Sequence, residues 1–339
     1  MNRVLSTYTI LFLFVILSSA SSQIRPTRLS PGDTILFVAP SGHLKKERMA
    51  LAKKRLEERG YITIQSEDIF RQHGYLGGTD ERRVAEFMMG WTNPHVKAIF
   101  PGTGGYGTTR ILDQLDYNII KTNPKILVGF SDITGLHLAI NKMTGLTTFH
   151  TPSPMYGLGS AKNLTPISNH YFWQAIEKDN PNGYTIDLKD FELGEPIITL
   201  HSGKGKGELI GGNLSLINTL MGTPYEIETK GKILFMEDVG EAPYRIDRYF
   251  SQLKMAGKFD HLEGVIIGRL TRRSTDPPDD KNSFTMMEVL EQYFSKLGVP
   301  VLVNFPIGHY KHNISLPIGT MAEIDADKQL IHILENPTQ

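Results

Sequence analysis

An α/β fold, with a parallel sheet covered by helices on both faces, is predicted for the first half of this chain. Short apolar runs typical of buried strands alternate there with segments whose apolar residues recur at helical spacing. Such alternation favours a parallel sheet. Because the chain has 339 residues, which is more than one typical domain, a second domain is expected.

The predicted elements of the first half follow one another in strict order. They are a strand at 32–42, a helix at about 45–59, a strand at 60–66, a helix at 79–91, a strand running into a glycine-rich loop at 96–107, a helix at 108–116 and a strand at 125–130. The helix at 79–91 has Thr79 or Asp80 as its candidate cap and acidic residues in its first turn.

The second half is set apart by a turn-rich stretch. We expect an N-terminal α/β domain at 29–165, a connector at 166–202 and a C-terminal domain at 203–339. The C-terminal elements are predicted as a strand and helix at 206–224, a strand at 231–241, a helix at 244–257, a strand at 262–270, a helix at 284–298, a strand leading into a turn at 299–313 and a hairpin at 320–334.

Composition excludes several classes of protein. The chain has 36 lysines plus arginines and 36 aspartates plus glutamates, and no block of basic residues occurs. The sequence therefore lacks the basic cluster that is typical of nucleic-acid-binding proteins. The absence of cysteine excludes disulfides and thiol catalysis. No apolar run reaches 18 residues, so no ordinary membrane span is expected.

The N-terminus has the layout of a secretory signal peptide at residues 1–22. Arg3 precedes a short apolar stretch, and small residues follow at 18–22. We expect cleavage near Ala20 to Ser22, export to the periplasm or the extracellular space, and no stable membrane insertion afterwards. An uncleaved anchor is the alternative, although the apolar stretch is short for one.

Three features are expected to share the carboxyl edge of the parallel sheet, where ligands bind in such folds. They are the turn at 39–42, the glycine loop at 102–107 and Ser131. Ser131 stands where a buried strand turns into a helix. It is interpreted either as the N-cap of that helix or as a nucleophile with the helix N-terminus behind it.

The glycine loop PGTGGYG fits neither phosphate-binding motif. It is interpreted as a tight turn without a ligand or as a source of an oxyanion donor, namely the Gly105 amide. The Asp132 amide, at the predicted helix start, is a second candidate donor.

A serine nucleophile requires a base and an acid. His309 directly follows an apolar strand, and so does Glu237, whose carboxylate would be costly to bury without a partner. His312 is an alternative to His309, and Asp238 and Glu241 compete with Glu237. A metal site is disfavoured because no H-E-x-x-H motif occurs and His309 and His312 lack a third ligand.

Eight blocks in order resemble the L,D-carboxypeptidase family of serine peptidases, which includes muramoyltetrapeptide carboxypeptidases and microcin-immunity peptidases. The blocks, which span about residue 29 to the C-terminus, are GDTILFVAPSG, YLGGTDERR, GGYGTTRILDQLDY, VGFSDITGLH, GGNLSLINTLMGTPYE, ILFMEDVGE, YRIDRYFSQLKMAG and FPIGHYKHNISLPIG.

The resemblance implies a doubly wound parallel-sheet N-terminal domain, a smaller mixed α/β C-terminal domain and a homodimer. It also implies a catalytic triad of Ser131, Glu237 and His309 in the cleft between the domains, oxyanion donors at Asp132 and Gly105, and no metal or other cofactor. The expected reaction is release of terminal D-alanine from murein tetrapeptides through an acyl-enzyme.

Two departures from the family bear on substrate and role. Thr103 stands where the family usually carries an arginine, and the expected export differs from the cytoplasmic recycling role of many members. The group that binds the substrate carboxylate stays open between the loop amides, Arg245 and Arg248. Two other functions also stay open: an exported peptide- or solute-binding protein without catalysis, and a peptidase or amidase that acts on a peptidyl-nucleotide antibiotic.

Overall fold

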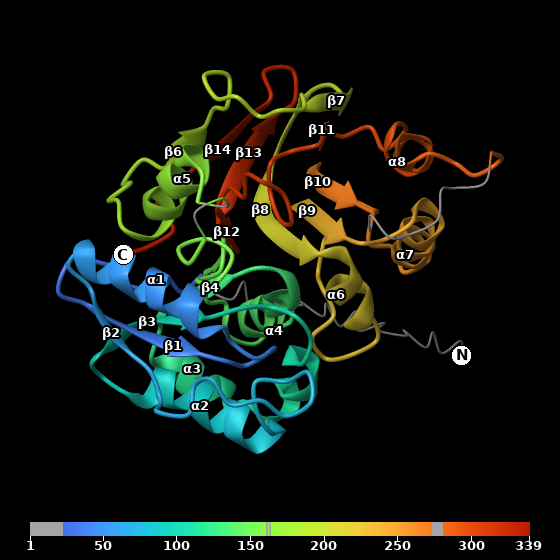
Figure 1. The fold of residues 1–339 in the computed structure, drawn as a ribbon. Helices are drawn as coiled ribbons and strands as arrows, with labels where there is room; N and C mark the ends of the chain where they lie inside the picture. The colour runs from blue at the N-terminus through green and yellow to red at the C-terminus, as the bar shows by residue number, and fades with distance from the viewer. Residues whose placement is uncertain (1–22, 161, 163, 273–280) are drawn as a thin grey trace, which may run out of the picture.

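Two twisted β-sheets organise the structure, one built mainly from the first half of the chain and one from the second (Figure 1). The structure is a computed structural model, and it describes residues 23–160, 162, 164–272 and 281–339. The predicted signal peptide, residues 1–22, lies outside the described residues. Within these ranges, no helix combines the length and apolarity that crossing a bilayer requires.

The first sheet has the order β12-β5-β4-β3-β1-β2. Its strands are β1 (Thr34–Val38), β2 (Ile62–Ile64), β3 (Val96–Pro101), β4 (Ile126–Gly129), β5 (Thr148–His150) and β12 (Leu316–Ile318). β1 to β5 pair in parallel, as predicted, whereas β12 pairs with β5 in the antiparallel sense.

Helices cover both faces of the first sheet, which confirms the prediction. They are α1 (Lys46–Glu58), α2 (Asp80–Thr92), α3 (Tyr117–Thr122) and α4 (Thr134–Thr144). Ile35 and Phe37 of β1 pack in one hydrophobic cluster with α1, and Leu36 and Val38 pack in another with α2, α3 and α4. This division follows from the alternation of side chains along a strand.

Thr79 caps α2 through its side chain, as one of the two candidates predicted. The helix expected at 108–116 is instead a pair of short 3₁₀ turns, η1 (Thr108–Arg110) and η2 (Leu112–Gln114). Thr108 donates its backbone N–H and its hydroxyl to Asp132, which holds this segment against the next loop. Tertiary contacts therefore override the local helical pattern here.

The second sheet is mixed and has the order β6-β14-β13-β8-β9-β10-β11-β7. Its strands are β6 (Tyr184–Ile186), β7 (Ile198–His201), β8 (Lys204–Asn213), β9 (Lys232–Val239), β10 (Gly264–Thr271), β11 (Val301–Val303), β13 (Met321–Asp325) and β14 (Leu330–Ile333). The four strands from β8 to β11 are parallel, and β13 and β14 form the predicted antiparallel hairpin.

The remaining helices are α5 (Pro166–Ile176), α6 (Leu214–Thr219), α7 (Pro243–Met255) and α8 (Met286–Phe294). The stretch for which the sequence predicts a connector, 166–202, contains α5, β6 and β7. β6 pairs with β14, and β7 pairs with β11, so this stretch supplies both edges of the second sheet. Turn-rich composition marks the loops between these short elements.

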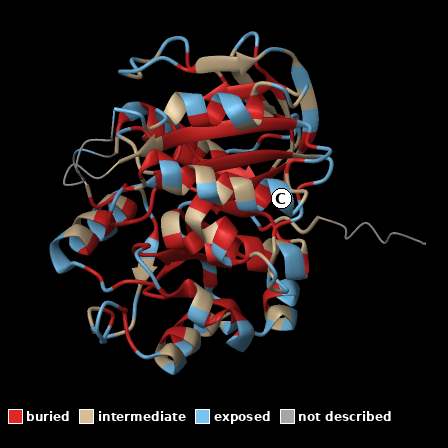
Figure 2. Cartoon of the chain, turned by 90° about the vertical axis from the view of Figure 1, so that its right-hand side faces the viewer, coloured by how far each residue is buried: buried red, intermediate tan, exposed pale blue. Residues whose placement is uncertain are grey.

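The interiors of both sheets are buried, and the helices expose only their outer sides (Figure 2). One hydrophobic cluster contains residues of both halves, from Leu36 of β1 to Ile324 of β13. The two sheets therefore share a continuous apolar core, against which the loops between them are held.

Candidate active site

Ser131 follows β4 and opens the 3₁₀ turn η3 (Ser131–Ile133), with a backbone φ of 63°. The interpretation of Ser131 as a helix cap is wrong: α4 begins at Thr134, and neither η3 nor α4 has a side-chain cap. A positive φ is uncommon for a residue with a side chain, and such strain clusters at functional sites. The strained turn presents the Ser131 hydroxyl to the cavity between the sheets.

The three residues predicted as a catalytic set lie together. Ser131 Oγ is 3.0 Å from His309 Nε2, and His309 Nδ1 is 2.7 Å from Glu237 Oε2. The backbone N–H of His309 also donates to Glu237 Oε2, at 3.1 Å. A carboxylate facing Nδ1 requires a proton there, which leaves Nε2 as the acceptor for the serine hydroxyl.

Both partners of Ser131 belong to the part of the chain that forms the second sheet, one in a strand and one in a loop. Glu237 lies in β9 and is fully buried, whereas His309 is partly exposed in the loop after β11. That loop passes so close to β9 that a Cβ on Gly308, whose φ is +80°, would lie 2.1 Å from Glu237 Oε2. The Gly308 N–H donates to Asn313 Oδ1, which fixes the loop from the other side.

The pKa values of His309 and Glu237 show the coupling between them. Burial lowers the pKa of His309, but the charge of Glu237 and the hydrogen bond to it outweigh burial and raise the pKa overall. Burial raises the pKa of Glu237, and the attraction of His309 outweighs this and lowers it. The pair therefore favours an imidazolium next to a carboxylate, the state that forms when a histidine takes a proton from serine.

The alternative acids and base have other partners. The Asp238 carboxylate accepts hydrogen bonds from Ser215 and Asn213, and burial together with the charge of Glu237 raises its pKa to about 6. Glu241 pairs with Arg245. His312 is buried, with its Nδ1 next to the Thr165 hydroxyl. Only Glu237 and His309, of these candidates, hydrogen-bond to one another.

The two predicted oxyanion donors belong to the residue after Ser131 and to the glycine loop that packs against Ser131. Gly104 packs so tightly against Ser131 that a Cβ there would lie 2.8 Å from the Cβ of Ser131 and 3.2 Å from the Asp132 amide nitrogen. Gly105 lies next in the same loop, with a φ of +115°. Among the described residues, neither the Gly105 N–H nor the Asp132 N–H has an acceptor, so both are available to a ligand.

The Asp132 carboxylate is a feature that the sequence analysis missed. It is buried and accepts hydrogen bonds from the Ser41 hydroxyl at 2.6 Å and the Thr108 N–H at 2.9 Å. Asp132 thus ties the turn after β1 and the end of the glycine loop to the turn η3 that begins at Ser131. No local pattern signals this role, because its partners lie 91 and 24 residues away.

His150 was also missed. Its ring lies between Phe130 and Phe235, and burial lowers its pKa to about 4, which keeps it neutral. The uncharged His150 ring packs against Phe130. The Phe130 ring centroid in turn lies 4.8 Å from that of His309.

A cavity of about 650 Å³ opens above Ser131 and His309, a volume suited to a small peptide. Its lining residues come from both sheets: Thr103, Gly104, Gly105, Phe130, Ser131, Tyr156, Val239, Gly308, His309, Tyr310, Lys311 and Asn313. Arg245 and Arg248 are not among them and lie instead against Tyr244. Within the described ranges, no cluster of side chains could hold a metal ion.

A serine hydroxyl, an imidazole and a buried carboxylate joined in this order are the arrangement of serine hydrolases. Residues 35–151 match the model of the LD-carboxypeptidase N-terminal domain, and residues 206–324 match that of the LD-carboxypeptidase C-terminal domain. The chain belongs to the LD-carboxypeptidase family of serine peptidases, which confirms the resemblance seen in the sequence and makes the protein a hydrolase.

Relatives of this chain cover nearly its whole length. A probable murein peptide carboxypeptidase of Bacillus subtilis is 39% identical over 307 residues, covering 90% of this chain and 92% of that protein. The microcin C7 self-immunity protein MccF of Escherichia coli is 30% identical over 329 residues, covering 91% and 94%.

Solved structures show the same two-domain fold. MccF in complex with glutamyl sulfamoyl guanosine matches with a TM-score of 0.83 at 28% identity, covering 93% of this chain and 99% of that one. The muramoyltetrapeptide carboxypeptidase of Oxalobacter formigenes matches with a TM-score of 0.74 at 28% identity, covering 88% and 97%. The predicted α/β fold class is thereby confirmed.

Proposed function

We propose that this protein is a serine carboxypeptidase that hydrolyses the L,D peptide bond preceding terminal D-alanine in murein tetrapeptides. The observation that carries the proposal is the hydrogen-bond chain from Ser131 through His309 to Glu237, which opens into a peptide-sized cavity. The murein substrate is supported by the names of two relatives, the Bacillus subtilis protein and the Oxalobacter formigenes enzyme.

In the proposed mechanism, Ser131 Oγ attacks the carbonyl carbon of the L-configured centre while its proton passes to His309 Nε2. Glu237 holds Nδ1–H and stabilises the imidazolium. His309 then returns the proton to the nitrogen of D-alanine, the C–N bond breaks, and an acyl-enzyme on Ser131 remains. A water molecule, deprotonated by His309, attacks this ester and restores the serine hydroxyl.

The tetrahedral intermediate carries a negative charge on oxygen, which the Gly105 and Asp132 amides would stabilise. Asp132 follows Ser131 directly, Gly105 lines the same cavity as Ser131, and neither amide has a protein acceptor among the described residues; these observations support the assignment. One such donor typically contributes about 10²–10³ in kcat.

The Ser131→Ala variant tests the proposed function. With a defined tetrapeptide that ends in an L,D bond, we expect D-alanine release to fall by about 10⁴-fold or more, because the nucleophile is lost. Release is measured by mass spectrometry, with a D,D-terminated peptide as the substrate control. Ser295→Ala, at the C-cap of α8 and outside the cavity lining, is the protein control. Trimming of the L,D peptide by Ser131→Ala at near wild-type rate would refute the proposal.

A second candidate is cleavage of a peptidyl-nucleotide antibiotic. It is favoured by the structural match to MccF bound to glutamyl sulfamoyl guanosine. Two of the aromatic residues that line the cavity, Tyr156 and Tyr310, also offer rings on which a base could stack. Product analysis after incubation with both substrate types separates the two functions. Stoichiometric binding without any product would instead point to a binding protein.

Export and dimerisation also remain proposals, drawn from residues 1–22 and from the family resemblance. Cell fractionation with N-terminal sequencing tests the first: a mature chain that begins near Gln23 and lies outside the cytoplasm is expected. Sedimentation of the purified protein tests the second, with a mass twice that of the chain expected.

A further inference from the structure

A carboxypeptidase has to recognise a free carboxylate one residue beyond the bond that it cleaves. Successive Cα atoms are about 3.8 Å apart, so this carboxylate enters the same cavity as the scissile carbonyl. The group that binds it must therefore line the cavity above Ser131. This requirement excludes Arg245 and Arg248, which lie outside the lining.

Lys311 is the only lysine or arginine among the described residues that line the cavity. It lies two residues after His309 in the same loop, and its side chain is exposed. Within the described ranges it takes part in no ion pair, unlike Arg269, which is held by Glu195. The ammonium group of Lys311 is thus available to a ligand.

The charge of the cavity favours an anion. No aspartate or glutamate is among its described lining residues, and Glu237 is fully buried beneath His309. Thr103, at the place where an arginine is usual in the family, adds a hydroxyl but no charge. Lys311 therefore supplies the lysine or arginine charge among the described residues that line the cavity.

The loop that carries Lys311 is anchored on both sides of it. The Tyr310 hydroxyl donates to the Leu193 carbonyl at 3.0 Å, and the Arg269 guanidinium lies 4.5 Å from the Tyr310 ring centroid. Beyond Lys311, the Asn313 N–H donates to the Ser168 hydroxyl at 2.9 Å. The backbone of Lys311 is therefore held in place, and only its side chain has freedom to reach the ligand.

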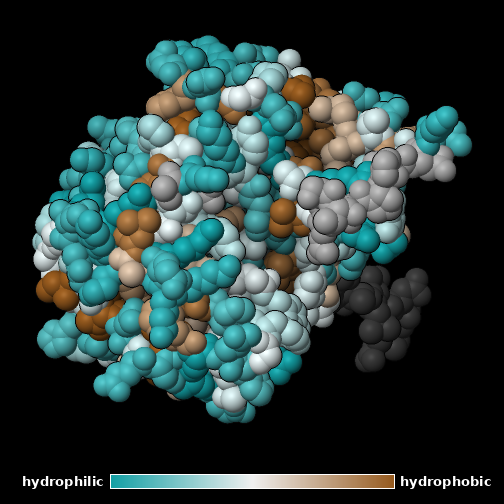
Figure 3. Space-filling view, viewed as in Figure 1, coloured by the Kyte–Doolittle hydropathy of each residue, from teal (hydrophilic) through white to brown (hydrophobic). Residues whose placement is uncertain are grey.

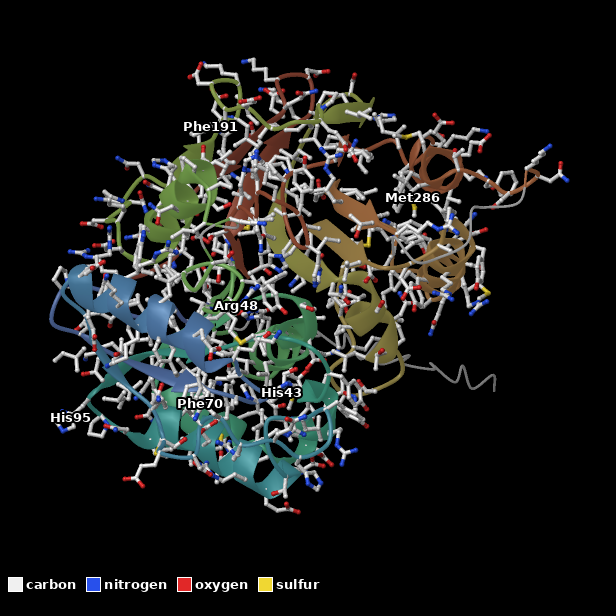
Figure 4. The ribbon with its side chains drawn as sticks, in the orientation of Figure 1. His43, Arg48, Phe70, His95, Phe191 and Met286 are labelled. Carbon is white, nitrogen blue, oxygen red and sulfur yellow. The ribbon has the colours of Figure 1, made fainter. Side chains whose placement is uncertain are left out.

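Other walls of the cavity are supported in the same manner. Arg48, labelled in Figure 4, extends from α1 toward the loop after β5, where it lies over the Tyr156 ring and donates to the Met155 carbonyl. On the far side of Tyr310, a separate hollow of about 300 Å³ is lined largely by apolar residues such as Leu270, Met286 and Val303. Hydrophobic side chains gather over this region in Figure 3. Arg269, the one lysine or arginine among the described residues of its lining, is already paired with Glu195, so this hollow is a poor second site for a carboxylate.

We propose that Lys311 binds the terminal carboxylate of the substrate and makes the enzyme selective for a free C-terminus. This inference rests on the proposed function and names the group that recognises its substrate. An ammonium–carboxylate hydrogen bond is charge-assisted, and its loss in a partly wet cavity is expected to weaken binding roughly tenfold.

Binding to catalytically inactive protein tests the inference without depending on cleavage. In the Ser131→Ala background, calorimetry compares a murein tetrapeptide with a free C-terminus and the same peptide with a C-terminal amide. We expect the free acid to bind about tenfold tighter than the amide. Lys311→Met should remove this difference, whereas Lys311→Arg should keep most of it. Lys296→Met, a change at an exposed lysine outside the cavity, should have no effect.

A second pair of peptides distinguishes the terminal carboxylate from a side-chain carboxylate. One peptide has lysine and the other diaminopimelate as its third residue. If Lys311→Met weakens only the diaminopimelate peptide, or if it leaves the preference for acid over amide intact, the inference is overturned. Turnover by the enzyme with an intact Ser131 is measured separately, and absence of D-alanine release there contradicts the proposed function. Loss of the preference for the free acid over the amide in Lys311→Met still supports carboxylate recognition by Lys311, whatever the turnover result.

Discussion

At the scale of single residues, the site depends on backbone conformations that most side chains avoid. Ser131 has a φ of 63°, and Gly308 has a φ of +80° with no room for a Cβ beside Glu237. The conformation costs about 1 kcal/mol or more at Ser131, a residue with a side chain, whereas glycine adopts its positive φ without strain. The two conformations place the Ser131 hydroxyl and the His309 imidazole at hydrogen-bond distance without a ligand.

Gly308→Ala separates steric conflict from backbone strain. Its Cβ would meet Glu237 Oε2 at 2.1 Å, so we expect Glu237 or the His309 loop to shift and kcat to fall at least 100-fold, about 2.7 kcal/mol. Gly298→Ala is the matched control, since Gly298 has a φ of +73° and open space around it. That variant should lose about 1 kcal/mol of stability and keep its activity. Equal losses of activity in both variants would contradict the steric argument.

The pH dependence of activity should report the His309–Glu237 pair. Because Glu237 raises the pKa of His309, the histidine stays protonated, and unable to act as a base, until the pH exceeds about 6.5, its ordinary value. kcat/KM should therefore rise with pH through an apparent pKa above that value, which belongs to the coupled pair.

Glu237→Gln removes the charge that raises the His309 pKa, and burial then lowers it. We expect the rise in kcat/KM to move to lower pH and its plateau to drop by about 10³–10⁴-fold. Glu241→Gln is the control, because Glu241 pairs with Arg245 rather than His309. If kcat/KM rises at the same pH in Glu237→Gln and in the unaltered enzyme, Glu237 does not set the His309 pKa.

At the scale of elements, the glycine loop and the turn η3 that begins at Ser131 form one unit. The Asp132 carboxylate bonds to Ser41 and Thr108, and the Gly42 N–H donates to the Gly104 carbonyl at 3.1 Å. The loops after β1, β3 and β4 are thus joined, which keeps the two candidate oxyanion donors at a constant separation.

Asp132→Ala should disrupt this unit while leaving Ser131 in place. We expect kcat to fall about 10²-fold with KM little changed, because the donors serve the transition state. Asp132→Asn should retain most activity, since one of the two carboxylate oxygens, Oδ1, has no partner in the described structure and an amide keeps the other acceptor. Steady-state kinetics on both variants measures this, and an equal effect of the two would argue for charge rather than geometry.

At the scale of the whole molecule, the two sheets are interlocked. β12 belongs to the second half of the chain by sequence but extends the first sheet, where Leu316 pairs with His150. One hydrophobic cluster also runs through both halves. The residues on either side of the cavity are consequently held at a set distance by shared packing.

Leu316→Ala tests this interlock. Leu316 is fully buried, so its truncation should cost about 2–5 kcal/mol of unfolding free energy. Because the core is continuous, the midpoints of urea unfolding followed by tryptophan fluorescence and by circular dichroism should decrease together. Leu334→Ala, at a position 36% exposed, should change little. Separate transitions by the two probes would indicate that the halves unfold independently.

Local patterns in the sequence were sufficient for the fold class and for most elements. Alternating strands and helices predicted the parallel sheet, and the hairpin of β13 and β14 was also predicted, because burial imposes a period on apolar residues. The helix predicted at 108–116 is absent, and of the two interpretations of Ser131 the N-cap is wrong. Both segments are shaped by contacts with distant residues, such as Thr108 with Asp132, which no local period records.

The sequence by itself determined which residues have the chemistry of the site: a serine after one buried strand, a glutamate in a second, and a histidine after a third. Family resemblance, rather than spacing, singled out Ser131, Glu237 and His309 from their neighbours. Only the tertiary structure decided that the three share one hydrogen-bond chain, that Asp132 joins the loops around them, and that Lys311 rather than Arg245 or Arg248 faces the cavity. The physical reason is that each of these relations is a distance of a few ångströms between residues far apart in the chain, and such distances depend on how the two sheets pack together.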